Sequence, residues 1–242
     1  MYSIFLKEIR SFLSSLIAYV VIIVFLLLVG LFTWVFAEGN VLSLGYSNLD
    51  VLFFVAPWVF VFLISAITMR SFSEEIRQGT FETLSTKPIT DFQIILGKYF
   101  AAICLVAFAI LPTLLYFYSI YQLGLPKGNI DVGATWGSYI GLLMLGACYA
   151  AIGIFASAIT SNQIIAFILG MFLCFFFYVG FQQLSNLSLF GGLDHLIQWL
   201  GIQYHYDSIS RGVVDTRDII YFVSVITGFL GLTYLVLDRR KW

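Results

Sequence analysis

Long uncharged stretches are the feature of this sequence that most limits how the chain can fold. The 12 Lys and Arg and 13 Asp and Glu residues gather in short clusters. The uncharged stretches lie between Arg10 and Glu38, Asp50 and Arg70, Lys98 and Lys127, Asp131 and Asp194, and Asp218 and Asp238. A helix that crosses a bilayer needs about 20 mostly apolar residues. The stretch before Asp194 is long enough for two crossings, separated by a polar turn at 160–163, and each of the others holds one.

The sequence therefore predicts an all-α integral membrane protein with a single transmembrane domain over residues 1–242. Six spans are expected, near 12–36, 51–70, 94–120, 135–159, 163–185 and 218–237. Hydrophobic residues make up 61% of the chain and charged residues 10%, against about 45–50% and about 25% in soluble domains. That composition excludes a soluble globular or disordered chain. The net charge of −1 gives no field for binding nucleic acid.

The Lys and Arg residues predict the orientation. With six spans, both termini lie on the same side of the membrane, and nine of the twelve basic residues lie on that side. The basic side is normally the cytoplasmic one. We therefore expect a multi-pass protein of the bacterial cytoplasmic (inner) membrane with both termini in the cytoplasm.

The external loop at 186–217 carries an amphipathic pattern. Leu193, Leu196, Ile197 and Leu200 recur at helical spacing, and Trp199, Tyr204 and Tyr206 are of the kind found at membrane interfaces. Two alternatives stay open for this helix, a gate at the external mouth and an interfacial cover. His195 and His205 in the same loop could form a metal pair or a proton relay, but their spacing favours ordinary interfacial polar residues.

Small residues and prolines within the spans leave two further questions open. Gly137 and Gly141 form a G-x-x-x-G pattern, which allows close helix approach. They form either a dimer face between two permease chains or a packing contact within one chain, and the second alternative is favoured. Pro57 and Pro112 mark either kinks or hinge points.

The internal segment at 72–88 is the most informative loop. Together with its flanks it carries four acidic and four basic residues. Ser73 followed by Glu74 and Glu75 is typical of a helix start, Gly79-Thr80 interrupts that helix, and Lys87-Pro88 ends it. Positive-inside topology does not require the acidic residues. The mixed charge is instead typical of a docking surface for a cytoplasmic protein.

This segment resembles the cytoplasmic motif of ABC-2 type transporter permeases, approximately E-x-x-x-G-T-x-E-x-L followed by P-I. Here the motif is Glu-Glu-Ile-Arg-Gln-Gly-Thr-Phe-Glu-Thr-Leu at 74–84, with Pro88-Ile89 after it. The opening at 7–12, the segment at 210–215 and the final Asp238-Arg239-Arg240 also resemble that family. Within the family the sequence is most similar to permease subunits associated with gliding motility.

The resemblance implies a type V exporter-like fold with an N-terminal elbow helix at about 2–11 and a cytoplasmic coupling helix. The coupling helix would dock an ABC ATPase subunit, and a second permease or membrane subunit would complete the path. The residues that match the coupling motif are Glu74, Glu75, Arg77, Gly79, Thr80 and Glu82. The elbow helix would turn Ile4, Phe5, Ile9 and Phe12 toward lipid and Lys7, Glu8 and Arg10 toward headgroups or the ATPase.

Several kinds of chemistry find no support in the sequence. There is no phosphate-binding G-x-x-x-x-G-K-[ST] motif, so ATP and Mg²⁺ are expected only in a separate motor chain. We expect no ionisable residue in a span core, which disfavours ion-coupled transport. The sequence also shows no nucleophile with a base and no paired acids of the kind an enzyme needs. Transport of an amphipathic, lipid-linked or cell-surface substrate is the favoured hypothesis. Transmission of ATP-driven motion to a periplasmic partner and a plain membrane scaffold are the alternatives.

Overall fold

The computed structural model describes residues 1–36, 41–80, 90–187, 191 and 194–239, and all regular structure in these ranges is helical. The helices before the longest one are α1 (Tyr2–Leu13), α2 (Leu16–Trp34), α3 (Val41–Leu44), α4 (Asp50–Thr68), α5 (Ser73–Arg77), α7 (Asp91–Ile110), η1 (Leu111–Thr113) and α8 (Leu114–Leu123). The remaining helices are α9 (Val132–Ile159), α10 (Gln163–Phe175), η2 (Phe176–Gly180), α11 (Phe181–Asn186), α12 (Asp194–Trp199), α13 (Ile202–Ile209) and α14 (Thr216–Arg239).

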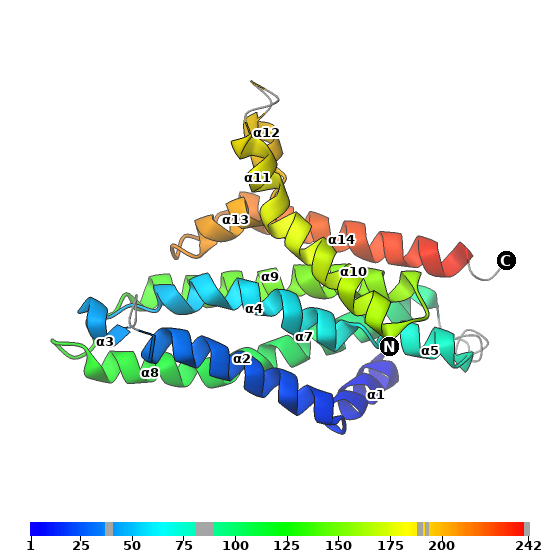
Figure 1. Ribbon diagram of the computed structural model, residues 1–242, viewed down its shortest axis with the longest axis horizontal. Coiled ribbons are helices and arrows are strands. Elements are labelled where there is room, and N and C mark those ends of the chain that lie inside the picture. Colours follow the sequence, from blue (N-terminus) through cyan, green and yellow to red (C-terminus); the bar gives the residue numbers. More distant parts are fainter. Residues whose placement is uncertain (37–40, 81–89, 188–190, 192–193, 240–242) are drawn as a thin grey trace.

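Six helical segments are long and apolar enough to cross a membrane, which confirms the number of spans expected from the sequence. They are 16–34, 50–77, 91–123, 132–159, 163–186 and 216–239. Most of them run along the long axis of the molecule, while α10 and α11 cross the bundle obliquely and leave it (Figure 1). The first span begins four residues later than we predicted, because the chain turns at Ser14–Ser15 and Phe12 belongs to the separate helix α1.

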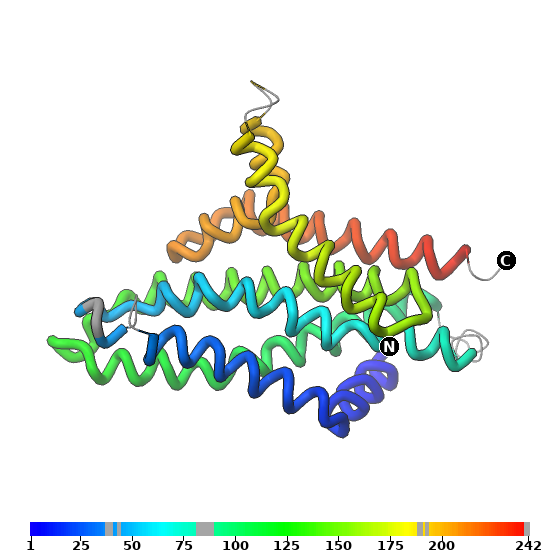
Figure 2. The backbone as a smooth tube through the Cα atoms, viewed as in Figure 1, coloured from blue at the N-terminus to red at the C-terminus, as the bar shows by residue number. Residues whose placement is uncertain are grey.

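Two of the spans are interrupted. Span three changes from α-helix to a short 3₁₀ turn at Pro112, which lacks the N–H needed to continue the hydrogen-bond ladder. Span five contains the π-helical turn η2. After this turn the span leaves the bundle (Figure 2). Pro57, by contrast, lies inside α4, which continues through it.

The helix α9 forms the centre of the bundle, where it contacts α4, α7, α10 and α14. Glycines allow that close approach. A Cβ atom on Gly146 would lie 2.7 Å from Cγ1 of Val106 on α7, and one on Gly153 would collide with the Thr68 hydroxyl on α4. The outer spans α2 and α14 are mostly exposed in the isolated chain, as expected for helices that face lipid or another membrane subunit.

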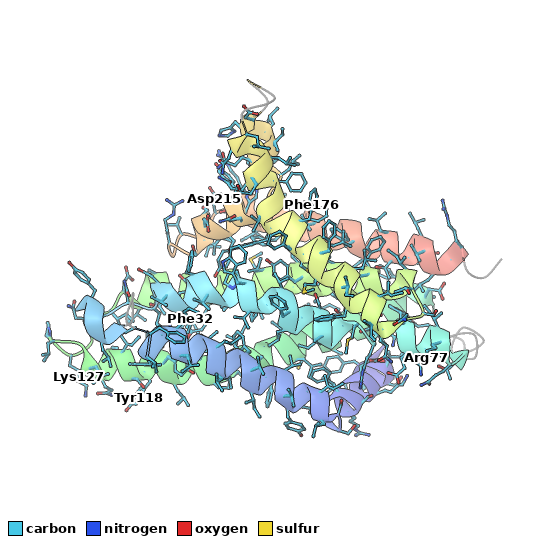
Figure 3. The ribbon with its side chains drawn as sticks, viewed as in Figure 1. Phe32, Arg77, Tyr118, Lys127, Phe176 and Asp215 are labelled. Carbon is cyan, nitrogen blue, oxygen red and sulfur yellow. The ribbon has the colours of Figure 1, made fainter. Side chains whose placement is uncertain are left out.

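We call the end of the bundle that carries α1 and α5 the α5 end, and the end that carries α3 the opposite end. Figure 3 shows Arg77 at the first and Lys127 at the second. After α11 the chain turns back toward the bundle through α12 and α13, and α13 packs on α9 (Figure 1). We call α12 and α13 the α13 cap. The tight turn between α9 and α10 is at the α5 end, where the Asn162 carboxamide oxygen accepts a hydrogen bond from Ile164 N–H.

The α13 cap differs from the single interfacial helix that we predicted. Leu193 lies outside the described residues, and no residue of α12 is buried. The buried helix is α13, where Ile209 covers Gly141 and the Tyr206 hydroxyl donates a 2.8 Å hydrogen bond to the Phe53 carbonyl. Tyr206 is thus buried within the protein by its contact with α4, and the interfacial position of this loop stays a prediction.

The same contacts bear on the G-x-x-x-G pattern of α9. A Cβ atom on Gly137 would lie 2.8 Å from the Gly212 carbonyl, and one on Gly141 would lie 2.6 Å from Cγ2 of Ile209. Both glycines are therefore covered by the same chain. This favours the packing alternative and leaves neither glycine free for a dimer face in this conformation.

Candidate functional site

Residues that the sequence analysis singled out in the N-terminal helix and in the internal segment at 72–88 meet at the α5 end. Lys7 on α1 contacts Glu75 on α5, although 68 residues separate them in the chain, and Glu8 on α1 belongs to the same group. The centre of the group is Lys98 on α7, which we had not included among the candidate site residues. We call these four side chains the Lys98 cluster.

Ion pairs connect the Lys98 cluster across three helices. The Lys98 Nζ lies 2.7 Å from Oε1 of Glu8 and 3.1 Å from Oε2 of Glu75. It also donates a 2.6 Å hydrogen bond to the Ser71 carbonyl. The side chain of Lys98 is 1% exposed, so its charge depends on these acceptors for compensation. Lys98 lies near the start of the span 91–123 and not in its core, so it does not contradict the expectation for the span cores, and α1 and α5 bring the carboxylates that neutralise it.

The second ion pair of the cluster lies nearer the solvent. The Lys7 Nζ is 2.7 Å from Oε1 of Glu75, and the Lys7 side chain is 57% exposed. Burial alone would lower the pKa of Lys7, but the hydrogen bond and negative charge of Glu75 outweigh it and raise the pKa above its usual value. Glu75 thus forms ion pairs with two cations, one in the bundle and one at the surface.

Close packing of α1 on α7 makes these pairs reachable. Gly97 precedes Lys98, and a Cβ atom there would lie 3.1 Å from Cγ2 of Ile4 and 3.2 Å from the Met1 carbonyl. Ile4 is therefore buried against α7, and our expectation that it faces lipid was wrong. The start of α7 is fixed by Thr90, whose hydroxyl accepts a hydrogen bond from Gln93 N–H.

The helix α5 is also anchored to the centre of the bundle. Ser157 on α9 accepts hydrogen bonds from the backbone N–H groups of Phe72 and Ser73, at 2.9 and 3.1 Å. Its hydroxyl donates to the Met69 carbonyl at 3.1 Å. Because the first N–H groups of a helix have no partners within it, Ser157 satisfies two of them from another span. A movement of α5 would therefore load α9 as well as α1 and α7.

The tip of α5 points outward and is exposed to solvent. Arg77, Gly79 and Thr80 are exposed, and Figure 3 shows Arg77 at the extreme of the bundle. Gly79 has a φ of +67°, which ends the helix as predicted. Glu74 is half-buried and accepts from the Gln78 carboxamide. Glu82, Lys87 and Pro88 lie outside the described residues.

The candidate docking residues thus divide into two sets. Glu75 and Glu8 turn toward the bundle and hold it together, whereas Arg77, Gly79 and Thr80 present a surface. Arg10 on α1 is also exposed. A signal for the role of Lys98 was present in the sequence, since this lysine is the eighth residue of a helix that is otherwise uncharged after Asp91. We had counted it only as a topology charge.

The two histidines of the α13 cap are not brought together as a metal pair. His195 on α12 is exposed, and His205 on α13 is buried beside Asp218. Within the described parts of the chain no group of three or more His, Cys, Asp or Glu side chains could hold a metal ion.

Comparison with known proteins gives one finding. The family model described as ABC-2 family transporter protein matches residues 40–235. A search of curated proteins finds no significant match. The matched range includes α5, the central helix α9, the α13 cap and most of α14.

Proposed function

Since this chain belongs to the ABC-2 family of transporter proteins, we propose that it couples an ATPase motor to export. The coupling takes place at the α5 end. Members of this family are the membrane permease subunits of ABC transporters. ATP and Mg²⁺ are assigned to a separate ATPase chain, and this chain supplies the spans and the docking surface. The outward tip of α5, from Arg77 to Thr80, is the proposed contact, continued by the segment to residue 88.

The observation that carries this proposal is the Lys98 cluster. An ATPase that pulled on α5 would pull on Glu75, and through it on Lys98 of α7 and Lys7 of α1. Separating a buried charge from its partner is costly. The pairs therefore favour concerted movement of α1, α5 and α7 over movement of α5 alone, which is the mechanical property required of a coupling element.

The outer surface of the spans supports an amphipathic or lipid-linked substrate. A groove of about 680 Å³ lies between α2 and α4, and its lining is aliphatic and aromatic, including Phe32, Phe54, Trp58 and Phe167. An apolar surface of this kind suits an acyl chain or the helices of a second permease or membrane subunit. We propose that two such subunits enclose the path there.

The cellular setting is proposed from sequence alone. Nine of the twelve basic residues lie on the side of the termini, which supports placing both termini in the cytoplasm of a bacterial inner-membrane protein. The similarity to gliding-motility permeases supports a cell-surface substrate used in movement. A deletion strain complemented with the Arg77→Glu variant would test that role, since loss of spreading with normal membrane levels is expected.

The decisive experiment is purification of the tagged chain from its host in mild detergent, followed by identification of bound proteins and an ATP hydrolysis assay. The structure indicates that Glu75→Lys would damage the fold, so Arg77→Glu is the better docking variant. We expect Arg77→Glu to lose the ATPase subunit while the melting temperature stays unchanged. The matched control is Lys127→Glu, which makes the same kind of change at the opposite end of the bundle.

Two outcomes would overturn the proposal. An intact complex without any nucleotide-hydrolysing subunit would favour a scaffold. Full ATPase binding and full hydrolysis in Arg77→Glu would remove the tip of α5 from the contact. If hydrolysis is coupled but no substrate moves in reconstituted vesicles, motion transmitted to a periplasmic partner becomes the favoured function.

A further inference from the structure

The α13 cap contains a buried pair of ionisable side chains that the proposed transport mechanism does not use. The Nδ1 atom of His205 on α13 lies 2.7 Å from Oδ1 of Asp218 on α14. The side chains are 1% and 7% exposed. Among the described residues, Oδ2 of Asp218 has no hydrogen-bond partner. The contact with His205 is therefore the main compensation for burying this carboxylate.

The neighbours of the two ring nitrogens of His205 limit how many protons His205 and Asp218 can hold together. Nε2 lies 2.9 Å from the Trp199 carbonyl, which can only accept a hydrogen bond. The Asp218 carboxylate on the other side is also an acceptor. A neutral imidazole has a single N–H and can satisfy only one of these neighbours. Both contacts require two protons on the pair, so either both ring nitrogens of His205 carry one or Asp218 carries one and donates it to Nδ1.

Two neighbours favour placing the extra proton on His205 and not on Asp218. Asp218 lies in the first turn of α14, where the helix dipole stabilises a negative charge. The ring of Tyr221 stacks on the His205 ring with 3.8 Å between centroids and 18° between planes, and an aromatic face attracts a cation. The favoured state is therefore His205 positively charged and Asp218 negatively charged.

We propose that His205 and Asp218 form a proton-dependent latch, which holds α13 and the end of α12 against the start of α14. Loss of one proton from this pair leaves a single N–H for two acceptors, so either the Trp199 or the Asp218 contact breaks. It also leaves a buried carboxylate without a counter-charge. The latch is closed at low pH on the α13 side of the membrane and weakens as that pH rises.

A polar cavity gives the proton a route to the pair. About 420 Å³ of space borders His205 and Asp218 between α11, α12, α13 and α14. The other titratable and charged groups that line it are Tyr204, Asp207, Arg211, Asp215 and Arg217, while α11 and α12 contribute the uncharged Gln182, Gln198 and Trp199. Only His205 and Asp218 among these connect two helices through a buried ion pair in the described chain.

The first test reads the proton directly. The chain has two histidines, so the His195→Gln variant leaves His205 as the one source of imidazole signals. We expect ¹⁵N magnetic resonance of labelled protein in nanodiscs at about pH 6 to show both His205 nitrogens protonated. A spectrum with one protonated nitrogen at that pH would overturn the proposal.

The second test reads the latch. Hydrogen exchange of the α13 amides is measured from about pH 5 to about pH 9 and corrected for the intrinsic effect of pH. Protection of α13 relative to α9 should fall by about tenfold or more across that range. His205→Gln should have low protection at every pH, and Asp218→Asn should lose the pH dependence.

The control is His195→Gln, which changes the exposed histidine and should keep the wild-type profile. A pH dependence that survives in His205→Gln, or α13 protection that stays constant with pH in the wild type, would refute the latch. Neither test needs the ATPase, so failure here leaves the docking proposal untouched, and failure of docking leaves the latch untouched.

Discussion

Two regions of this molecule, the α5 end and the α13 cap, are held together by different sets of contacts. At the α5 end, long side chains of Lys7, Glu8, Glu75 and Lys98 join three helices through ion pairs. At the α13 cap, the single ion pair of His205 and Asp218 is accompanied by close approach of backbones, as where Gly212, just after α13, meets Ala134 of α9. Long flexible side chains can follow a moving partner, whereas close-packed surfaces have few intermediate arrangements. The comparison indicates that the Lys98 cluster is an adaptable joint between helices, at the end where the motor is proposed to act. The packing of the α13 cap on α9, which we call the seal, is instead either fully formed or broken.

The largest expected effect comes from removing the centre of the joint. Lys98→Ala leaves Glu8 and Glu75 facing each other without the buried cation, and we expect a loss of about 3 kcal/mol in the free energy of unfolding. Chemical unfolding in lipid micelles followed by tryptophan fluorescence would measure it. The control is Lys98→Met combined with Glu8→Gln and Glu75→Gln, which removes the stranded charges and should recover part of the loss. A change below about 0.5 kcal/mol in Lys98→Ala would show that the cluster is not a structural joint.

The second prediction concerns the packed seal. Gly212 has a φ of +86°, and a Cβ atom there would collide with the backbone of Ala134. Gly212→Ala should therefore cost about 2 kcal/mol and open α13 to hydrogen exchange. Gly228→Ala is the matched control, because Gly228 on α14 has open space around its Cβ position. Equal stability of the two variants would contradict the idea of a close-packed cap.

The sequence predicted the spans well because the cost of burying a charge in lipid acts locally along the chain. Each of the six candidate spans overlaps one of the ranges that the uncharged stretches predicted. The helix α5 was also predictable, since Glu74 after Ser73 and the glycine at position 79 are local signals. Features that depend only on neighbours in the chain were accessible from sequence.

The contacts between distant segments of the chain could not be predicted from the sequence. Nothing near Lys98 in the chain indicates that Glu8, 90 positions away, will neutralise it. The same holds for His205, whose role depends on Asp218 and on a carbonyl of α12. The amphipathic pattern at 193–200 drew attention to α12, while the buried helix proved to be α13, where packing against glycines outweighs periodicity.

A third prediction sharpens the comparison at the seal. The Tyr206 hydroxyl donates to the Phe53 carbonyl across more than 150 residues of sequence. Tyr206→Phe keeps the ring packing and removes that one hydrogen bond, so we expect a loss of about 1 kcal/mol. The measurement is again chemical unfolding, with Tyr204→Phe on the exposed face of α13 as the control. If both variants lose the same stability, the hydrogen bond to α4 contributes nothing specific.

The smallest effect is expected at the exposed edge of the joint. Lys7→Ala removes the outer partner of Glu75, but the lysine is more than half exposed, so solvent screening limits the loss to about 0.5 kcal/mol or less. The pKa of Lys7 is raised in the folded chain. Its contribution is therefore complete below the ordinary lysine pKa of about 10.4 and is lost as the pH rises through the higher folded value. Unfolding measured at pH 8 and at alkaline pH, each at low and high salt, should show a difference between wild type and Lys7→Ala that shrinks with both pH and salt. A difference that is unaffected by salt would mean that Lys7 stabilises α1 through packing of its aliphatic chain, and the joint would then be held by Lys98 alone.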